Sequence, residues 1–125
     1  MLSNSKVSAV LAVKDMAKAK EFYEGKLGLK SSKGEDPGGI MYDCGGGTGV
    51  FVYESSFAGS NQATAAAWAV DDIAKAIEGL KAKGISFEHY DMPGVEHDGD
   101  IHVMGELKAA WFKDPDGNIL NLVNM

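Results

Sequence analysis

The first half of the chain alternates short apolar runs with one helix-like segment. Residues 7–13 are apolar and compatible with a strand, and Asp15 follows them in the position of a helix N-cap. Apolar side chains then recur at helical spacing until Gly28, which predicts the end of the helix. After it the pattern predicts an edge strand (residues 29–31), a loop (35–39) and a strand (40–44). A glycine turn (45–47) and a strong strand (48–54) follow. The order of these elements is βαβββ.

The second half has the same order of elements. Residues 64–70 predict a strand, Asp72 is placed to cap a helix, and Gly84 is placed to end it. The remaining elements are a strand (residues 85–90), a long loop (91–107) and a second strand (108–113). A turn (114–117) and a last strand (118–123) complete the half. In the turn, Pro115 fixes φ and Gly117 can take a positive φ.

An internal repeat relates the two halves. Residues 12–19 (AVKDMAKA) and 69–76 (AVDDIAKA) are identical at six of eight positions, with an offset of 57. The repeat predicts that one supersecondary unit occurs twice, and that any ligand lies between the two copies. We expect a single domain over residues 1–125. It would consist of a first module (1–56), a linker rich in Ser, Gly, Ala and Asn (55–63) and a second module (64–125).

Composition and charge narrow the choice of partners. The chain has 125 residues and is 45% hydrophobic, which is enough for one domain. Its 18 acidic and 12 basic residues give a net charge of −6, and the lysines are spread along both predicted helices, which opposes nucleic-acid binding. No apolar run approaches the roughly 20 residues of a membrane span, and the N-terminus carries no basic-then-apolar signal. The single cysteine, Cys44, excludes an intramolecular disulfide. We expect a soluble, cytoplasmic protein with neither a nucleic-acid nor a membrane partner.

Four segments carry a resemblance to a known family: residues 13–16 (VKDM), 22–23 (FY), 27–29 (LGL) and 111–118 (WFKDPDGN). Together with the repeat, they resemble the vicinal oxygen chelate superfamily of glyoxalases, bleomycin-resistance proteins and extradiol dioxygenases, over essentially the whole chain. The resemblance implies an α+β fold in which two βαβββ modules form a curved mixed sheet. This half-barrel would carry the helices on its convex side and a ligand in its concave cleft. The resemblance also implies a homodimer, with the modules either swapped or unswapped between chains.

In enzymes of this family, four strand positions in the concave cleft hold a divalent metal. Because successive strand residues point to opposite faces, the larger apolar set is expected under the helices and the alternate set in the cleft. The repeat then places Ser8, Phe51, Ala65 and Asn121 at the four positions. None is a good ligand, since such metals need imidazole or carboxylate donors. A register shift of one residue brings only Thr64 and apolar neighbours. We therefore predict no metal and no other cofactor.

Three histidines, His89, His97 and His102, fall within fourteen residues and among several acidic side chains. The first is placed on a strand and the others on a glycine-rich loop, without the i, i+4 spacing of a helical zinc site. We interpret the loop, residues 92–106, as a solvated lid rather than a metal site. His97 and His102 remain candidate acid–base groups if the lid folds over a ligand, because histidine titrates near neutrality.

The two tryptophans are predicted to differ in role. Trp68 corresponds to Leu11 in the repeat, which places it in the core beneath the second helix. The closing turn places Trp111 opposite Asn121 on the cleft face, whereas a turn one residue longer would place Phe112 there instead.

The candidate ligand site combines aromatic walls with few polar groups, as small-molecule pockets do. Its predicted members are Ser8, Phe51, Tyr53, Trp111, Asn121 and His102. The alternative is that the rings only fill the curved sheet. Asp114 and Asp116 need no catalytic role in a Pro-Gly turn, and no catalytic residue is assigned.

Two function classes follow. The first is a metal-free binding protein, similar to the bleomycin-resistance proteins, that holds a planar or aromatic compound in the concave cleft. The alternative is a metal-dependent enzyme resembling a glyoxalase-type lyase or an extradiol dioxygenase, in which the metal would polarise adjacent oxygens of the substrate. The missing ligand set favours the first. A regulatory or structural dimer is a third interpretation, and the identity of the ligand does not follow from the sequence.

Overall fold

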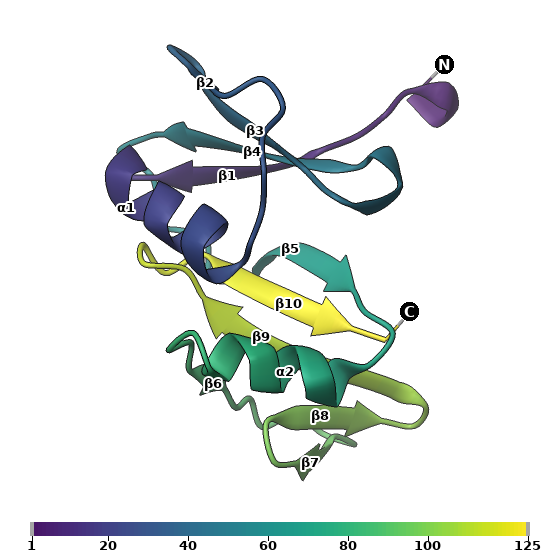
Figure 1. Ribbon diagram of the computed structural model, residues 1–125. Coiled ribbons are helices and arrows are strands. Elements are labelled where there is room, and N and C mark those ends of the chain that lie inside the picture. Colours follow the sequence, from purple (N-terminus) through teal and green to yellow (C-terminus); the bar gives the residue numbers. More distant parts are fainter. Residues whose placement is uncertain (1, 125) are drawn as a thin grey trace.

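The computed structural model describes residues 2–124, whose strands form two sheets (Figure 1). The first sheet has the strand order β1-β4-β3-β2. These strands are β1 (Ala9–Val13), β4 (Gly49–Glu54), β3 (Gly39–Asp43) and β2 (Glu35–Asp36). The second sheet has the order β5-β10-β9-β8-β7. These strands are β5 (Thr64–Ala69), β10 (Ile119–Val123), β9 (Leu107–Lys113), β8 (Ile101–Met104) and β7 (Glu96–Asp98). In addition, β6 (Phe87–Glu88) pairs with β9.

The main helical elements are α1 (Met16–Lys20), which continues as the π-helix η2 (Glu21–Lys26), and α2 (Ile73–Lys81). Two short 3₁₀ segments, η1 (Leu2–Asn4) and η3 (Gly45–Gly47), complete the list. Figure 1 shows α1 and α2 in front of the strands, on the same side of both sheets. Among residues 2–124, no helix is long and apolar enough to span a membrane.

The two halves have the same strand register. β1 pairs with β4 in parallel, with Leu11 opposite Val52, and β5 pairs with β10 in parallel, with Trp68 opposite Leu122. Along β1 and β5, the two pairs are related by the offset of the sequence repeat, since Trp68 follows Leu11 by 57 residues. β1 and β5 are neighbours but belong to separate sheets, so the strands do not close into a barrel. The predicted α+β fold of two βαβββ modules with a curved, open sheet is confirmed.

Both helices begin at the predicted caps, because Asp15 and Asp72 each accept backbone N–H groups of the first helical turn. Each helix is followed by a glycine of positive φ, +73° at Gly28 and +88° at Gly84. The first cap and its glycine are thirteen positions apart, whereas the second pair is twelve apart. The first helix accommodates the extra residue by widening into the π-helical turn η2.

A single apolar core contains side chains from both halves. Phe22 of η2 and Phe112 of β9 have ring centroids 6.4 Å apart. The predicted alternation is confirmed along β1, where Leu11 is 1% exposed and Val10 is 58% exposed. The strand predicted at residues 7–13 begins later than expected, since Val7 lies before β1 and is exposed to solvent.

A buried carboxylate at the closing turn ties the halves together. Asp114 Oδ2 accepts a hydrogen bond from the Tyr23 hydroxyl of η2 at 2.7 Å and from Asn118 Nδ2 at 2.8 Å. Its Oδ1 accepts from the backbone N–H groups of Asp116 and Asn118. Asn118 Nδ2 also donates to the Ala12 carbonyl oxygen of β1 at 2.7 Å. Burial and the Asp114 carboxylate raise the pKa of the Tyr23 phenol, which therefore stays protonated and donates.

The structure corrects four sequence predictions. The predicted loop 91–107 contains the hairpin β7–β8, and the predicted loop 35–39 contains β2. Conversely, the predicted strand 85–90 shrinks to the two residues of β6, and the predicted strand 29–31 is a single bridge between Lys30 and Asp43. These segments lie at sheet edges, where short pairings leave little period-2 signal in the sequence.

The buried carboxylate predicts different effects of two tyrosine truncations. Tyr23 and Tyr42 both donate to a carboxylate at 2.7 Å, but Asp114 is buried and Glu24 is exposed. Tyr23→Phe should lower the free energy of unfolding by about 1.5–3 kcal/mol, because the bond to a buried charged acceptor is lost. Tyr42→Phe is the matched control and should lower it by about 1 kcal/mol or less. Urea unfolding monitored by circular dichroism measures both, and equal losses would contradict the assignment.

Candidate functional site

The candidate site lies on the helix-free face, which we define as the face of the two sheets that points away from α1 and α2. Residues on this face alternate along the strands with buried core residues. In the first sheet, Phe51 and Tyr53 of β4 are half-buried, with stacked rings whose centroids are 6.2 Å apart. The exposed Val10 is the strand partner of Phe51. The first sheet thus presents an apolar, aromatic surface.

In the second sheet, Trp111 covers the interior strand β10. Trp111 of β9 pairs with Asn121 of β10, which confirms the predicted register, and Phe112 lies on the opposite face in the core. The Trp111 indole N–H donates to Thr64 Oγ1 of β5 at 3.0 Å, so the ring reaches across β10. Beneath it, Asn121 is buried and its amide donates to the Ala110 carbonyl oxygen at 3.1 Å. Trp111 is therefore available to a ligand, whereas the Asn121 side chain is already engaged.

His102 is part of this face and not of a solvated loop, which corrects the sequence interpretation. It lies on β8 opposite Ala109 and is fully buried, with its ring centroid 4.8 Å from that of Trp111. Its Nε2 accepts the backbone N–H of Tyr90 at 2.9 Å, so the neutral ring carries its proton on Nδ1. Burial, together with the neighbouring His97, holds the pKa of His102 below its ordinary value.

A sequence signal for this placement exists in the hairpin turn. The β7–β8 connection has two residues, Gly99 and Asp100, and Gly99 has a φ of +62°. A glycine at the first position of a two-residue loop is typical of a type II′ hairpin. That hairpin pairs His97 with His102 and brings both toward Trp111.

Two buried polar atoms in this cluster have no hydrogen-bond partner among residues 2–124: the Tyr90 hydroxyl and His102 Nδ1. The Tyr90 ring stands edge-on to Trp111, with centroids 5.6 Å apart. A buried polar group without a partner costs about 1–3 kcal/mol. A polar ligand group or a water molecule beside the Trp111 ring could therefore form the hydrogen bonds that these two atoms lack.

The histidines do not converge on a metal. His89 Nε2 lies 2.7 Å from Asp100 Oδ1, and His97 Nε2 lies 3.1 Å from the Tyr90 carbonyl oxygen. Hydrogen bonds from Lys81 and His89 hold the pKa of Asp100 below its ordinary value. Within residues 2–124, the structure brings together no group of three or more His, Cys, Asp or Glu side chains that could hold a metal ion.

The four positions predicted to correspond to the metal ligands of similar enzymes carry poor donors for a metal. Ser8 lies just before β1 and borders a shallow cavity of about 260 Å³ with Lys6 and Met41. Asn121 is engaged with the backbone, and the remaining two positions, Phe51 and Ala65, offer no donor atom in their side chains. This donor set is inadequate for a divalent metal.

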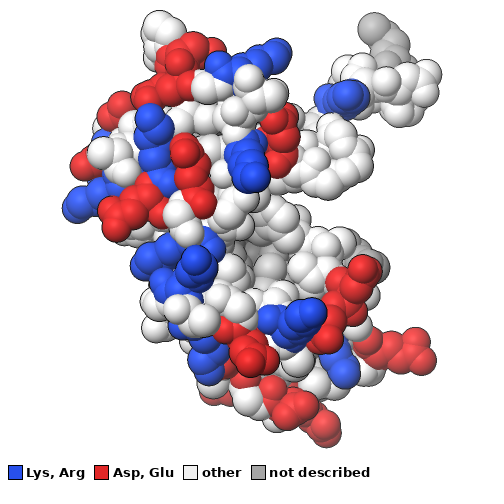
Figure 2. Space-filling model, in the orientation of Figure 1, with Lys and Arg blue, Asp and Glu red and all other residues white. Residues whose placement is uncertain are grey.

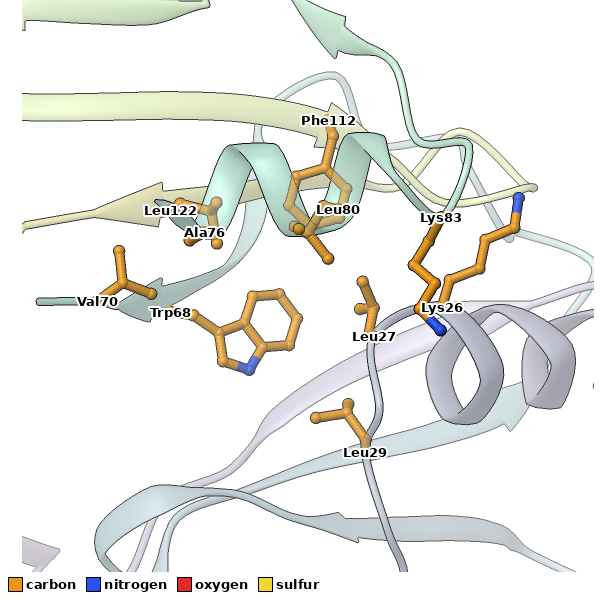
Figure 3. Close-up of a pocket in the computed structure, with 11 residues that line it drawn as sticks. Lys26, Leu27, Leu29, Trp68, Val70, Ala76, Leu80, Lys83, Phe112 and Leu122 are labelled. Atoms are coloured by element: carbon orange, nitrogen blue, oxygen red, sulfur yellow. The ribbon is translucent and has the colours of Figure 1, made fainter. Parts of the chain in front are cut away.

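Trp68 departs from its predicted place in the core. It is on the α2 side of β5, as expected, but is only half-buried and lines an open groove of about 340 Å³ between the two halves (Figure 3). A second cavity, of about 470 Å³, lies where β1 and β5 diverge and is bordered by Ala9, Val50 and residues 66–69.

The duplicated βαβββ fold and the open curved sheet define a two-module protein of the vicinal oxygen chelate type. The chain belongs to the Glyoxalase/Bleomycin resistance protein/Dioxygenase superfamily, whose family model matches residues 7–122. No curated protein sequence matches the chain closely enough to count as a relative.

Solved structures similar to this chain support the fold. A glyoxalase family protein from Enterococcus faecalis is 22% identical with a TM-score of 0.70, over 99% of this chain and 100% of that one. TnmS3, an antibiotic binding protein from a Streptomyces species, is 20% identical with a TM-score of 0.67, over 97% of each chain. A member of the superfamily from Sphaerobacter thermophilus is 25% identical with a TM-score of 0.68, over 100% of both chains.

The buried His102 predicts a loss of stability in mild acid. Its pKa is lowered from 6.5 in the folded protein, so below about pH 6.5 the unfolded chain takes up a proton that the folded chain resists. The free energy of unfolding should therefore be level above about pH 7 and fall between about pH 6.5 and 5. The Asp100 carboxylate acts in a separate window, because its stabilising effect is lost only at lower pH, as the pH falls through its lowered pKa.

Chemical denaturation at pH 7 and pH 5 measures the effect. His102→Gln should flatten the dependence, while His97→Gln should retain most of it, because burial, the larger cause of the lowered pKa of His102, remains. An unchanged slope in His102→Gln would show that another group is responsible.

Proposed function

We propose that this protein is a metal-free binding protein that holds a planar or aromatic small molecule on the helix-free face. Phe51 and Tyr53 of the first sheet and Trp111 of the second supply the aromatic walls. Rings gain about 0.5–1.5 kcal/mol from a stacked or edge-on partner beyond the burial of area, which suits them to a flat guest. The function requires recognition and no chemical step.

The single observation that carries the proposal is the juxtaposition of Trp111 with unsatisfied buried polar atoms. Within the described part of the chain, the Tyr90 hydroxyl and His102 Nδ1 have no hydrogen-bond partner, and both rings stand edge-on to the Trp111 ring. An aromatic surface with a few polar groups that lack partners is the usual composition of a small-molecule pocket. Of the six predicted site residues, Phe51, Tyr53, Trp111 and His102 keep a role in this proposal, while Asn121 and Ser8 are not needed as ligand contacts.

The similar structures agree with a binding role. One of them, TnmS3, is described as an antibiotic binding protein, and that description suggests the class of compound to try first. We further propose that two copies of the chain assemble as a homodimer, so that the open helix-free face of each is completed by the other.

Metal content tests the metal-free part of the proposal. The positions Ser8, Phe51, Ala65 and Asn121 offer no adequate donor set, so the purified protein should contain well below one equivalent of zinc, nickel, manganese or iron. A chelator should leave the melting temperature unchanged, because no bound metal contributes to stability. Elemental analysis of the protein purified without chelator decides, and a stoichiometric metal would favour the enzymatic alternative.

Tryptophan fluorescence tests the location of the ligand. The probes are bleomycin and a panel of neutral planar aromatic compounds, titrated into two single-tryptophan variants. Quenching should persist in Trp68→Phe, which keeps Trp111, and disappear in Trp111→Phe. Trp111→Ala should weaken binding by about tenfold or more, since a central aromatic contact is lost. Circular dichroism confirms that each variant is folded, and the reverse pattern of quenching would place the ligand away from the helix-free face.

A further inference from the structure

A second candidate site lies on the opposite side of the sheet, between the two helices. The groove runs between the end of η2 and α2, with walls from both halves of the chain (Figure 3). Its apolar lining consists mainly of half-buried side chains: Leu27, Leu29, Trp68, Val70 and Leu80. Its volume of about 340 Å³ lies within the range of small-molecule pockets.

The repeat explains why the groove is present in the second half. Whether the offset is 57, as before η2, or 56, as after its extra residue, one of the two buried rings of Phe22 and Tyr23 corresponds to Gly79 in α2. A Cβ atom placed on Gly79 would meet nothing within 4 Å. The second module therefore lacks the ring volume that fills the first, and Trp68 remains partly uncovered. An apolar groove of this kind on a water-exposed surface is a typical feature of a binding site.

Two lysines stand at the mouth of the groove. Lys26 of η2 and Lys83 after α2 are the charged side chains that line it, and both are positive (Figure 3). Among residues 2–124, neither ammonium group lies within ion-pair distance of a carboxylate, although the chain carries a net charge of −6. On the same face of the molecule, lysine side chains gather where the two halves meet (Figure 2).

We propose that this groove binds an amphipathic anion, a medium-length aliphatic carboxylate, with its chain in the groove and its head group between Lys26 and Lys83. The apolar lining accounts for the chain, because burial of methylene groups drives binding in proportion to area. The unpaired ammonium groups account for the charge, since a carboxylate would form charge-assisted hydrogen bonds with them. This site is separate from the helix-free face and does not depend on the function proposed for it.

Decanoate, below its micellar concentration, is the test ligand. Trp111→Phe leaves Trp68 as the single tryptophan, so a change in emission reports binding at the groove or at the neighbouring cavity that Trp68 also borders. The lysine and Ala76 variants described next distinguish the two, because these residues line the groove and not that cavity. Decanoate should produce saturable binding, and decanol, with the same chain and no charge, should bind at least tenfold more weakly. Equal affinities for the two would overturn the role of the lysines, and no saturable binding of decanoate would overturn the site.

Lysine variants in the same background identify the head-group contacts. The double variant Lys26→Gln, Lys83→Gln should weaken decanoate binding tenfold or more. The matched control Lys18→Gln, Lys75→Gln removes two exposed lysines of α1 and α2 that do not line the groove, and should change the affinity by less than about twofold. An equal loss in both variants would show that only net charge matters and would overturn the proposal.

A filled groove supplies the last test. Ala76→Phe adds a ring to the groove wall and should abolish decanoate binding, with circular dichroism and a melting curve confirming the fold. Sedimentation of the parent and the variant tests whether a second copy of the chain covers the groove. A mass that falls by half in Ala76→Phe, with no binding of decanoate to the parent, would assign the groove to self-association and overturn the proposal.

Discussion

The arrangement of the two halves depends on one buried carboxylate. Asp114 accepts four hydrogen bonds, one of them from Tyr23 in the first module, and holds Asn118 so that its amide reaches the carbonyl of Ala12. Nearby, Asp116 accepts the backbone N–H of Lys14. These bonds join the closing turn of the second module to the first strand and helix of the first. Because a buried carboxylate is stable only when its lone pairs are satisfied, the halves cannot separate at this point without a large cost.

This carboxylate also explains the closing motif, Asp114 to Asn118, in physical terms. The motif supplies the turn, with Gly117 at a φ of +92°, and the acceptor and donor groups that connect the modules. Its acidic residues therefore have a structural use that is independent of any reaction. In the sequence they were interpreted as turn residues without a catalytic role, and the hydrogen bonds found in the structure account for them without one.

Residue patterns predicted the parts of the structure that depend on periodicity and duplication. The repeat predicted two equivalent units, and the strand partners Leu11 with Val52 and Trp68 with Leu122 are equivalent in the two. The helix N-caps and the pairing of Trp111 with Asn121 were also predicted, from capping residues and from the length of the closing turn. The prediction for His102 was wrong, because its strand, β8, has only four residues and its burial comes from tertiary contacts with Tyr90 and Trp111. The prediction that Trp68 is buried failed for a related reason, since burial of Trp68 depends on the side chains of α2, where Gly79 lines the same groove and contributes no ring.

The two sites that we propose share an interior strand of the second sheet, β10. Asn121 of β10 lies beneath Trp111 on the helix-free face, and its neighbour Leu122 lines the groove beside Trp68 on the helix side. Successive strand residues point to opposite faces, so the two tryptophans report on opposite sides of the same strand. The strand is flanked by β5 and β9 along its whole length, which limits its movement when either face is occupied. The duplication thus gives one rigid sheet two chemically different surfaces: an aromatic one with unsatisfied polar groups, and an apolar one edged with positive charge.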